Sequence, residues 1–185
     1  MAAESMPALT IEPRATPAGE VASARLHGRT RLNLIGSRML EDAAARLSAL
    51  AAQPDLRCVV LRGAGPDAFV GGADLKELGT LTRDTAARFI RSIHGVCAAI
   101  RDCPVPVIAC VEGVCLGGGL EIAAACDFRI CSRDARFGMP EVRVGVPSVI
   151  EAALLPGLIG WGRTRELLLR GHLLDADEAA RIGLV

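Results

Sequence analysis

A glycine run and two well-spaced glutamates form the part of the sequence best suited to chemistry. Residues 116–121 read Leu-Gly-Gly-Gly-Leu-Glu and lead into the apolar segment 122–126, and Glu141 follows Glu121 by twenty residues. A glycine run that opens a helix presents unpaired backbone N–H groups at the positive end of the helix dipole, with no Cβ to crowd an approaching anion. An N–H donor beside a carboxylate suits the polarisation of a carbonyl group while a proton moves nearby.

The same glycine run has a simpler interpretation. Glycines often mark a turn from strand to helix, and a glutamate in the first helical turn commonly caps that helix. Gly117 and Gly118 would then serve only the turn, and Glu121 only the cap. Because Gly118 and Glu121 are three residues apart, a helix would in either case place the N–H donor and the carboxylate on one face.

A second glycine-containing segment follows an apolar strand earlier in the chain. Residues 58–62 have the composition of a buried strand, and residues 68–78 then read Ala-Phe-Val-Gly-Gly-Ala-Asp-Leu-Lys-Glu-Leu. Asp74 is expected to cap a helix that starts after it. Lys76 is the only lysine among 21 basic residues. It either lies near phosphate groups of a ligand as a point charge or is a solvated residue at the start of the helix.

The elements that must position these residues alternate between strand and helix. Apolar runs and helical spacing predict a hairpin over 9–14 and 20–27, strands over 58–62, 107–111 and 128–131, and helices over 37–52, 84–100, 118–126, 150–155, 164–169 and 176–182. This pattern alone establishes an α/β protein, and 185 residues suit a single core.

Three segments resemble the crotonase family, the enoyl-CoA hydratases and isomerases. Residues 68–77 are similar to the family's Ala-Phe-x-x-Gly-Ala-Asp-Leu-Lys-Glu. Residues 113–127 are similar to Gly-x-x-Leu-Gly-Gly-Gly-x-Glu-Leu-Ala-x-x-Cys-Asp, with Ile122 in place of leucine, and residues 137–145 to Phe-Gly-x-Pro-Glu-x-x-x-Gly. The segments occur in the family's order with matching spacing, and the resemblance covers roughly residues 20–185.

The resemblance implies an α/β fold built as a crotonase-like superhelix of ββα units. It divides the chain into residues 1–19, an N-terminal leader with the first strand, and residues 20–185, the crotonase-like core. Val185 resembles the point where the family's core ends, so the C-terminal helical segment that closes over the acyl-CoA and makes trimer contacts is expected to be missing. The family expectation is a homotrimer or hexamer, which this absence would impair.

The resemblance also implies a role for individual residues. The N–H groups of Ala73 and Gly118 would form an oxyanion hole for a thioester. Glu121 would activate water, and Glu141 would protonate the α-carbon. The substrate-binding positions would be Ala73, Asp74, Leu75, Lys76 and Gly117. Coenzyme A is part of the substrate, so neither a separate cofactor nor a metal is implied.

Two glutamates favour a hydratase, because a double-bond isomerase moves one proton and needs only the carboxylate matching Glu141. The predicted function is the addition of water to a 2-enoyl-CoA thioester, as in fatty acid metabolism. The alternatives are an isomerase or lyase of the same family, or a truncated acyl-CoA-binding protein of weak activity. Two carboxyl groups in an apolar site should repel each other, so that one pKa rises and one proton is shared.

One departure from the family lies after Glu141. Many members have a glycine pair where this chain has Ile150 and Glu151. These side chains would stiffen the backbone and fill space along the acyl group. Glu151 is expected to face solvent or to cap a helix, and the alternative is a third carboxylate in the pocket.

Several function classes are disfavoured. Equal numbers of acidic and basic residues (21 each), with no run of like charge, do not suggest nucleic-acid binding. No apolar stretch is long enough to span a membrane, and a cytoplasmic protein with seven reduced cysteines is expected. Residues 63–68 match a Gly-x-Gly-x-x-Ala dinucleotide motif, but Gly71 and Gly72 interrupt the helix that it requires. A Gly-x-Ser-x-Gly element of serine hydrolases is also missing from the sequence.

Overall fold

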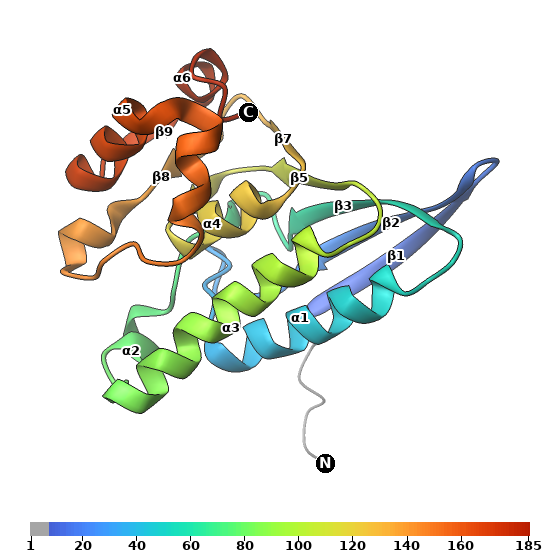
Figure 1. Cartoon of the computed structure of the whole chain (residues 1–185), viewed down its shortest axis with the longest axis horizontal. Helices are drawn as coiled ribbons and strands as arrows, with labels where there is room; N and C mark the ends of the chain where they lie inside the picture. The colour runs from blue at the N-terminus through green and yellow to red at the C-terminus, as the bar shows by residue number, and fades with distance from the viewer. Residues whose placement is uncertain (1–7) are drawn as a thin grey trace.

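The computed structural model describes residues 8–185 and contains two sheets with helices around them (Figure 1). Residues 1–7 of the predicted leader lie outside the described residues. The larger sheet has the order β1 (Leu9–Thr16), β2 (Gly19–Leu26), β3 (Leu56–Gly63), β5 (Val107–Val111) and β7 (Phe128–Cys131). β1 and β2 form the predicted antiparallel hairpin, and the other neighbouring strands pair in parallel. The boundary predicted after residue 19 falls within β2.

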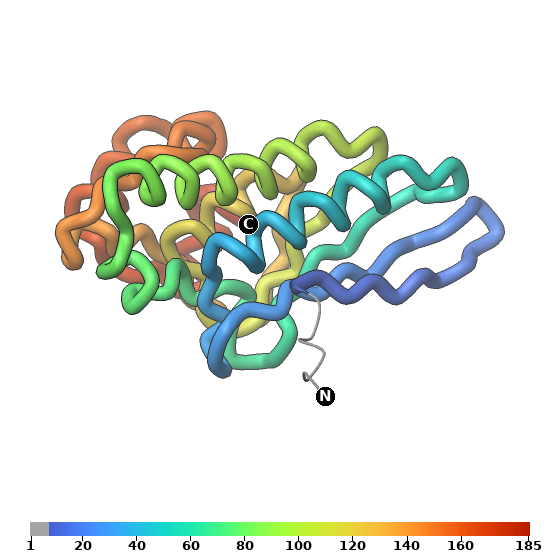
Figure 2. The backbone as a smooth tube through the Cα atoms, turned by 90° about the horizontal axis from the view of Figure 1, so that it is seen from below, coloured from blue at the N-terminus to red at the C-terminus, as the bar shows by residue number. Residues whose placement is uncertain are grey.

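Helices α1 (Ser37–Ala51) and α3 (Arg83–Arg101) run side by side along one face of this sheet (Figure 2). Leu40, Ala43, Leu47 and Leu50 of α1 are buried, which is the spacing of one helix face. In β2 from residue 22 and in β3 from residue 58, fully buried residues alternate with half-buried ones. The predicted helices over 37–52 and 84–100 are confirmed to within one residue at each end.

The smaller sheet has the order β4 (Ala68–Val70), β6 (Val114–Leu116), β8 (Arg136–Gly138) and β9 (Leu173–Asp175). β4, β6 and β8 pair in parallel, and β9 is antiparallel to β8. The sequence did not predict these strands, because three residues are too few to show an alternating pattern.

The strands of the two sheets alternate along the chain. β3 leads to β4 and, through α2 (Leu75–Leu78), to α3; β5 leads to β6 and α4 (Gly118–Ala125); β7 leads to β8 and the 3₁₀ segment η1 (Pro140–Val144). Each unit therefore contributes one strand to each sheet and then a helical element. This is the predicted superhelix of ββα units, and it stacks the three loops that follow β4, β6 and β8 side by side.

The C-terminal part contains η2 (Glu151–Leu154), α5 (Leu155–Arg170) and α6 (Ala176–Arg181). The helix predicted over 150–155 coincides with η2, which is a 3₁₀ helix. The helix predicted over 164–169 lies within the longer α5, which is interrupted at Gly160, where φ is +76°. None of the helices within residues 8–185 combines the length and the low charge needed to cross a bilayer.

Candidate active site

The glycine run enters α4 from the end of β6, and close contacts require two of its glycines. Gly117 has φ +53°, and a Cβ there would stand 2.6 Å from Oε1 of Glu141. A Cβ on Gly119 would stand 2.3 Å from the backbone oxygen of Val70, at the end of β4. These glycines allow both a carboxylate and a neighbouring strand to approach the N-terminus of α4 closely.

The predicted N–H donors of Ala73 and Gly118 are brought to neighbouring loops. β4 and β6 pair in parallel, and a Cβ on Gly72 would lie 3.4 Å from the backbone oxygen of Leu116. Ile35 forms a parallel bridge with Ala73: its N–H donates to the carbonyl of Gly72, and its carbonyl accepts from the N–H of Asp74. The N–H of Ala73 itself therefore points to the other side. Neither that N–H nor the N–H of Gly118 has an acceptor among residues 8–185.

Glu121 is buried, with 3% of its surface exposed, and its Oε1 accepts a hydrogen bond of 2.9 Å from the backbone N–H of Ala152. It does not cap α4, because no side chain caps that helix. Burial raises the pKa of Glu121 to about 7, from an ordinary 4.5. The N–H groups of Ala152 and Ile150 oppose this rise in pKa, and the charge of Glu141 adds to it.

Glu141 lies in the first turn of η1, next to the N-terminal turn of α4. Its Oε1 lies against Gly117, and its Oε2 is buried without a hydrogen-bond partner in the described part of the chain. Burial raises the pKa of Glu141, and its own backbone N–H and the hydroxyl of Ser148 oppose that rise. The expected repulsion between the carboxylates is therefore confirmed in direction for Glu121, whereas the shared proton stays a prediction.

The predicted substrate-binding segment lies at the edge of this site. Asp74 is buried and accepts a hydrogen bond of 3.0 Å from the backbone N–H of Lys76, which confirms its expected role as the cap of α2. Asp74 also binds Arg29 through an ion pair of 2.6 Å, a partner that the sequence did not indicate. Leu75 and Lys76 are exposed on α2, where a ligand can reach them.

Glu151 does not face solvent, so that expectation was wrong. The residue is only 6% exposed, and its Oε1 lies 2.7 Å from Nδ1 of His94 on α3. Arg101 of the same helix lies 4.0 Å from Oε2. η2 packs against α4, and this placement turns the Glu151 side chain toward α3 instead of outward. Its charge also raises the pKa of Glu121, which supports the alternative of a third carboxylate near the site.

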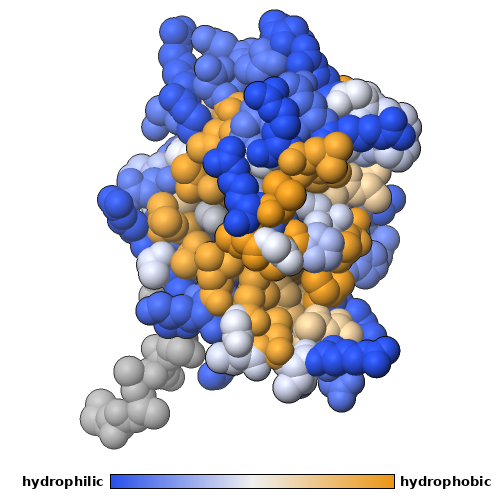
Figure 3. Space-filling view, turned by 90° about the vertical axis from the view of Figure 1, so that its left-hand side faces the viewer, coloured by the Kyte–Doolittle hydropathy of each residue, from blue (hydrophilic) through white to orange (hydrophobic). Residues whose placement is uncertain are grey.

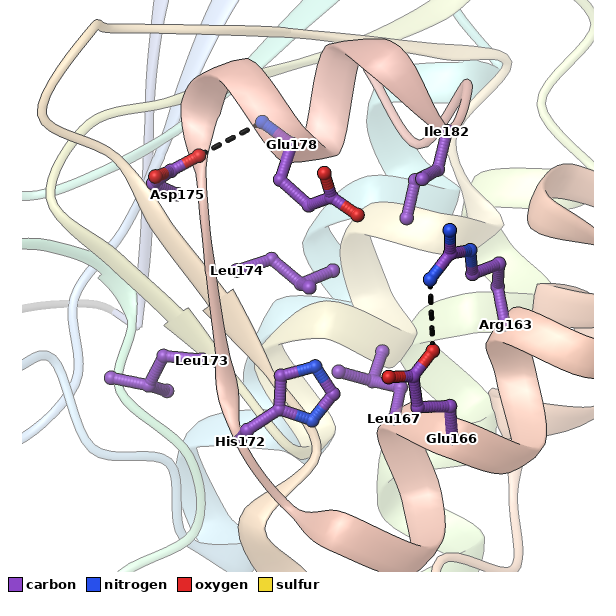
Figure 4. A pocket seen from close by; sticks show the side chains of 9 residues that line it. All are labelled: Arg163, Glu166, Leu167, His172, Leu173, Leu174, Asp175, Glu178 and Ile182. Carbon is purple, nitrogen blue, oxygen red and sulfur yellow. Dashed lines mark hydrogen bonds and ion pairs between the residues drawn. The ribbon is translucent and has the colours of Figure 1, made fainter.

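Two surface hollows have neither Glu121 nor Glu141 in their lining. One, of about 280 Å³, is shown in Figure 4 and lies among α5, β9 and α6. Arg163 binds Glu166 and Asp175 caps α6, whereas Nδ1 of His172 is buried without a hydrogen-bond partner among residues 8–185. The other, of about 220 Å³, includes the loop after β3. This loop leads into β4 and not into a helix, which removes the dinucleotide-binding alternative. Among residues 8–185, no group of three or more His, Cys, Asp or Glu side chains could hold a metal ion.

A ββα superhelix with a glycine-rich helix N-terminus beside two glutamates defines a crotonase-type protein. The sequence model of the enoyl-CoA hydratase/isomerase family matches residues 17–185. The crystal structure of an enoyl-CoA hydratase from Bacillus anthracis superposes with a TM-score of 0.89 at 34% identity, covering 96% of this chain and 68% of that one. The chain belongs to the enoyl-CoA hydratase/isomerase family.

Two curated relatives carry hydratase names. The cyclohexa-1,5-dienecarbonyl-CoA hydratase of Thauera aromatica is 36% identical over 157 residues, covering 85% of this chain and 59% of the relative. The short-chain-enoyl-CoA hydratase of Clostridium acetobutylicum is 36% identical over 168 residues, covering 90% of this chain and 64% of the relative. The chain thus spans about three fifths of the length of these relatives.

Proposed function

We propose that the protein adds water across the double bond of a 2-enoyl-CoA thioester at the N-terminus of α4. One observation carries this proposal: the buried carboxyl group of Glu121 and the partly buried carboxyl group of Glu141 lie by the N-terminal turn of α4, beside the N–H of Gly118, which has no acceptor among residues 8–185. The hydratase names of the two relatives and of the superposed structure support it.

The thioester oxygen would accept hydrogen bonds from the N–H groups of Ala73 and Gly118. As the oxygen of water bonds to the β-carbon, electrons move toward this thioester oxygen, where the two donors stabilise the negative charge. Removal of one such donor typically costs about 3 kcal/mol of transition-state stabilisation. Both donors belong to the backbone: Ala73 lies just before α2, and Gly118 is the first residue of α4. Their positions are therefore fixed before the substrate binds.

The two glutamates would handle the protons. Glu121 takes a proton from the attacking water, and Glu141 gives its proton to the α-carbon. Proton exchange then resets the pair, because Glu121 must lose the proton that Glu141 has to regain. Groups with raised pKa values suit this task, since a pKa near neutrality lets a carboxyl group both hold and release a proton. The pKa of Glu121, about 7, meets this requirement.

The molecule offers apolar surface for the acyl portion. Figure 3 shows apolar side chains gathered on the face that contains α2 and η1. The exposed residues of this part of the chain include Leu75, Val142 and Val144. Lys76 and Arg29, near the start of α2, supply positive charge for the phosphates of coenzyme A. The acyl-CoA would therefore extend from α2, across the N-terminus of α4, to η1.

An isomerase is the second candidate, because Glu121 is already bonded to Ala152 whereas Oε2 of Glu141 is unused by the described residues. A shift of a double bond needs only one carboxylate that moves a proton.

The test is the hydration of crotonyl-CoA, followed by loss of the enoyl-thioester absorbance, for wild type, Glu121→Gln and Glu141→Gln. Turnover that both substitutions abolish supports the hydratase. Turnover of a 3-enoyl-CoA that survives Glu121→Gln but not Glu141→Gln would establish the isomerase instead. A wild-type protein that binds crotonyl-CoA and converts neither substrate would contradict both.

A further inference from the structure

Glu151 is a buried carboxylate that the proposed reaction does not use. Its side chain is 8% exposed, and it lies between α3 and the backbone that contacts Glu121. Oε1 lies 2.7 Å from Nδ1 of His94, and Oε2 lies 4.0 Å from the guanidinium of Arg101. A carboxylate accepts hydrogen bonds, so we assign Nδ1 of His94 as the donor in this contact. The His94 side chain is 60% exposed, so this contact joins a surface residue to the interior.

The residue after Glu151 holds Glu121. The N–H of Ala152 donates a hydrogen bond of 2.9 Å to the Glu121 carboxylate, and the N–H of Ile150 adds a smaller contribution. The position of the Ala152 N–H depends on how firmly η2 is held in place. The backbone at Ile150 has φ −105° and ψ −108°, outside helical and strand conformations, and no side chain caps η2. The contact from Glu151 to α3 therefore anchors this segment at its first helical residue.

We infer that His94 and Glu151 form a positioning pair, which holds the N–H of Ala152 against Glu121 and so fixes the carboxylate that activates water. This role rests on the proposed function of Glu121. Neither His94 nor Glu151 touches the reacting atoms, and both act through Ala152. The pair ties three elements together, because His94 lies on α3, Glu121 on α4 and Glu151 on η2.

The charge of Glu151 adds a second, separable effect. The titratable and charged groups that face it are His94, Arg101 and the Cys97 thiol on α3, and Glu121 on α4. The negative charge of Glu151 contributes to the raised pKa of Glu121. Removal of the charge alone should lower the pKa of Glu121, whereas loss of the tether alone should free its carboxylate from Ala152.

Three substitutions in this 185-residue chain separate these effects. His94→Ala removes the donor and keeps the Glu151 charge. His94→Asn places an amide nitrogen near the position of Nδ1 and should restore the contact. Glu151→Gln keeps an acceptor for His94 and removes the charge. The matched control is Arg88→Ala, which removes another α3 side chain bonded to a glutamate, Glu41, at a distance from Glu121.

The readouts are the hydrogen-exchange rate of the Ala152 amide and the titration of Glu121, both by NMR, with kcat and KM for crotonyl-CoA. His94→Ala should speed exchange at Ala152 and lower kcat roughly ten- to a hundred-fold, with little change in KM, because a small misplacement of a catalytic group has effects of this size. His94→Asn should recover most of the loss. Glu151→Gln should lower the pKa of Glu121 and leave exchange at Ala152 slow.

The inference is overturned if His94→Ala matches Arg88→Ala in Ala152 exchange and in kcat. It is also overturned if His94→Ala lowers kcat but His94→Asn does not restore it. A wild-type protein without hydratase activity would refute the proposed function, and the Ala152 exchange rates would still decide whether the pair holds this segment.

Discussion

Glu121 and Glu141 meet at the same turn of α4, yet the protein holds them in different ways. Glu121 belongs to a helix whose eight residues are all buried, and a backbone N–H from η2 binds its carboxylate. Glu141 belongs to a 3₁₀ segment whose next three residues are exposed, and the described residues leave its Oε2 without a partner. The site thus joins one carboxylate held by the backbone of another element to one that is supported by its own turn and by the hydroxyl of Ser148.

The largest expected effect is on turnover. Glu121→Gln and Glu141→Gln should each lower kcat for hydration by roughly 10²–10⁴-fold, the usual contribution of a positioned acid or base. Because the amide is nearly the same size as the carboxyl group, KM should change much less. Steady-state kinetics with crotonyl-CoA measures both parameters. Equal activity of either variant and wild type would show that the two glutamates are not a catalytic pair.

The next effect is the pH dependence of stability. The folded-state pKa of Glu121 is about 7, above its ordinary 4.5, so the protonated form stabilises the fold. This stabilisation is present below pH 4.5 and is lost as pH rises through about 7, with a total of roughly 3 kcal/mol. Glu121→Gln cannot ionise and should escape the loss.

Urea unfolding at pH 4 and pH 8 checks this expectation. The free energy of unfolding of wild type should fall, relative to that of Glu121→Gln, between the two pH values. A constant difference across this range would mean that Glu121 titrates normally in the folded protein. Glu141→Gln serves as the comparison. The free energy of unfolding of wild type should also fall relative to that of Glu141→Gln as pH rises, because burial raises the pKa of Glu141 as well.

A substitution at Gly117 should disturb Glu141 and leave Glu121 in place. An alanine Cβ would stand 2.6 Å from Oε1 of Glu141 on a backbone with φ +53°, so strain of about 1–3 kcal/mol is expected, together with displacement of the carboxylate. Thermal unfolding and kcat measure the two consequences. Gly157→Ala is the control, since no atom lies within 4 Å of its Cβ position. Similar behaviour of both variants would contradict the close contact.

The smallest effect concerns Ser148. Its hydroxyl lowers the pKa of Glu141, so Ser148→Ala should raise that pKa further and move the corresponding limb of the kcat profile to higher pH. The pKa of Glu121 should not move, because the hydroxyl is not among the groups that shift it. A pH–rate profile for both proteins distinguishes the two glutamates. An unchanged profile would mean that the hydroxyl does not reach the carboxylate of Glu141.

The larger sheet could be predicted from the sequence, and the smaller sheet could not. Residues 107–111 and 128–131 match β5 and β7 in both bounds. β5 is a continuous apolar run, as is usual for a buried parallel strand, whereas β7 is short and has only Arg129 buried. The strands of the smaller sheet are three residues each, and only pairing with distant segments defines them. The larger sheet can therefore be predicted from the sequence more reliably than the short strands that lead into the candidate site.

The candidate site divides in a similar way. Gly117, Glu121 and Glu141 could be selected because glycine conformation and carboxylate chemistry are properties of the residues themselves. The contacts of Glu151 could not be predicted, since the direction of a side chain at the start of η2 depends on how that segment packs against α4. The bond from Ala152 to Glu121 joins residues 31 positions apart and leaves no local pattern.

The three-residue strands also have a consequence for the order of folding. Residues 71–113 separate β4 from β6 and residues 117–135 separate β6 from β8, so each pairing must first close a long loop. Helices α1 and α3 and the β1–β2 hairpin depend on local contacts and can form earlier. The N–H groups of Ala73 and Gly118, which we propose as oxyanion donors, come together only after β4 and β6 pair. During refolding from urea, we expect the far-ultraviolet signal to recover before crotonyl-CoA hydration, so that catalytic competence marks the last kinetic phase.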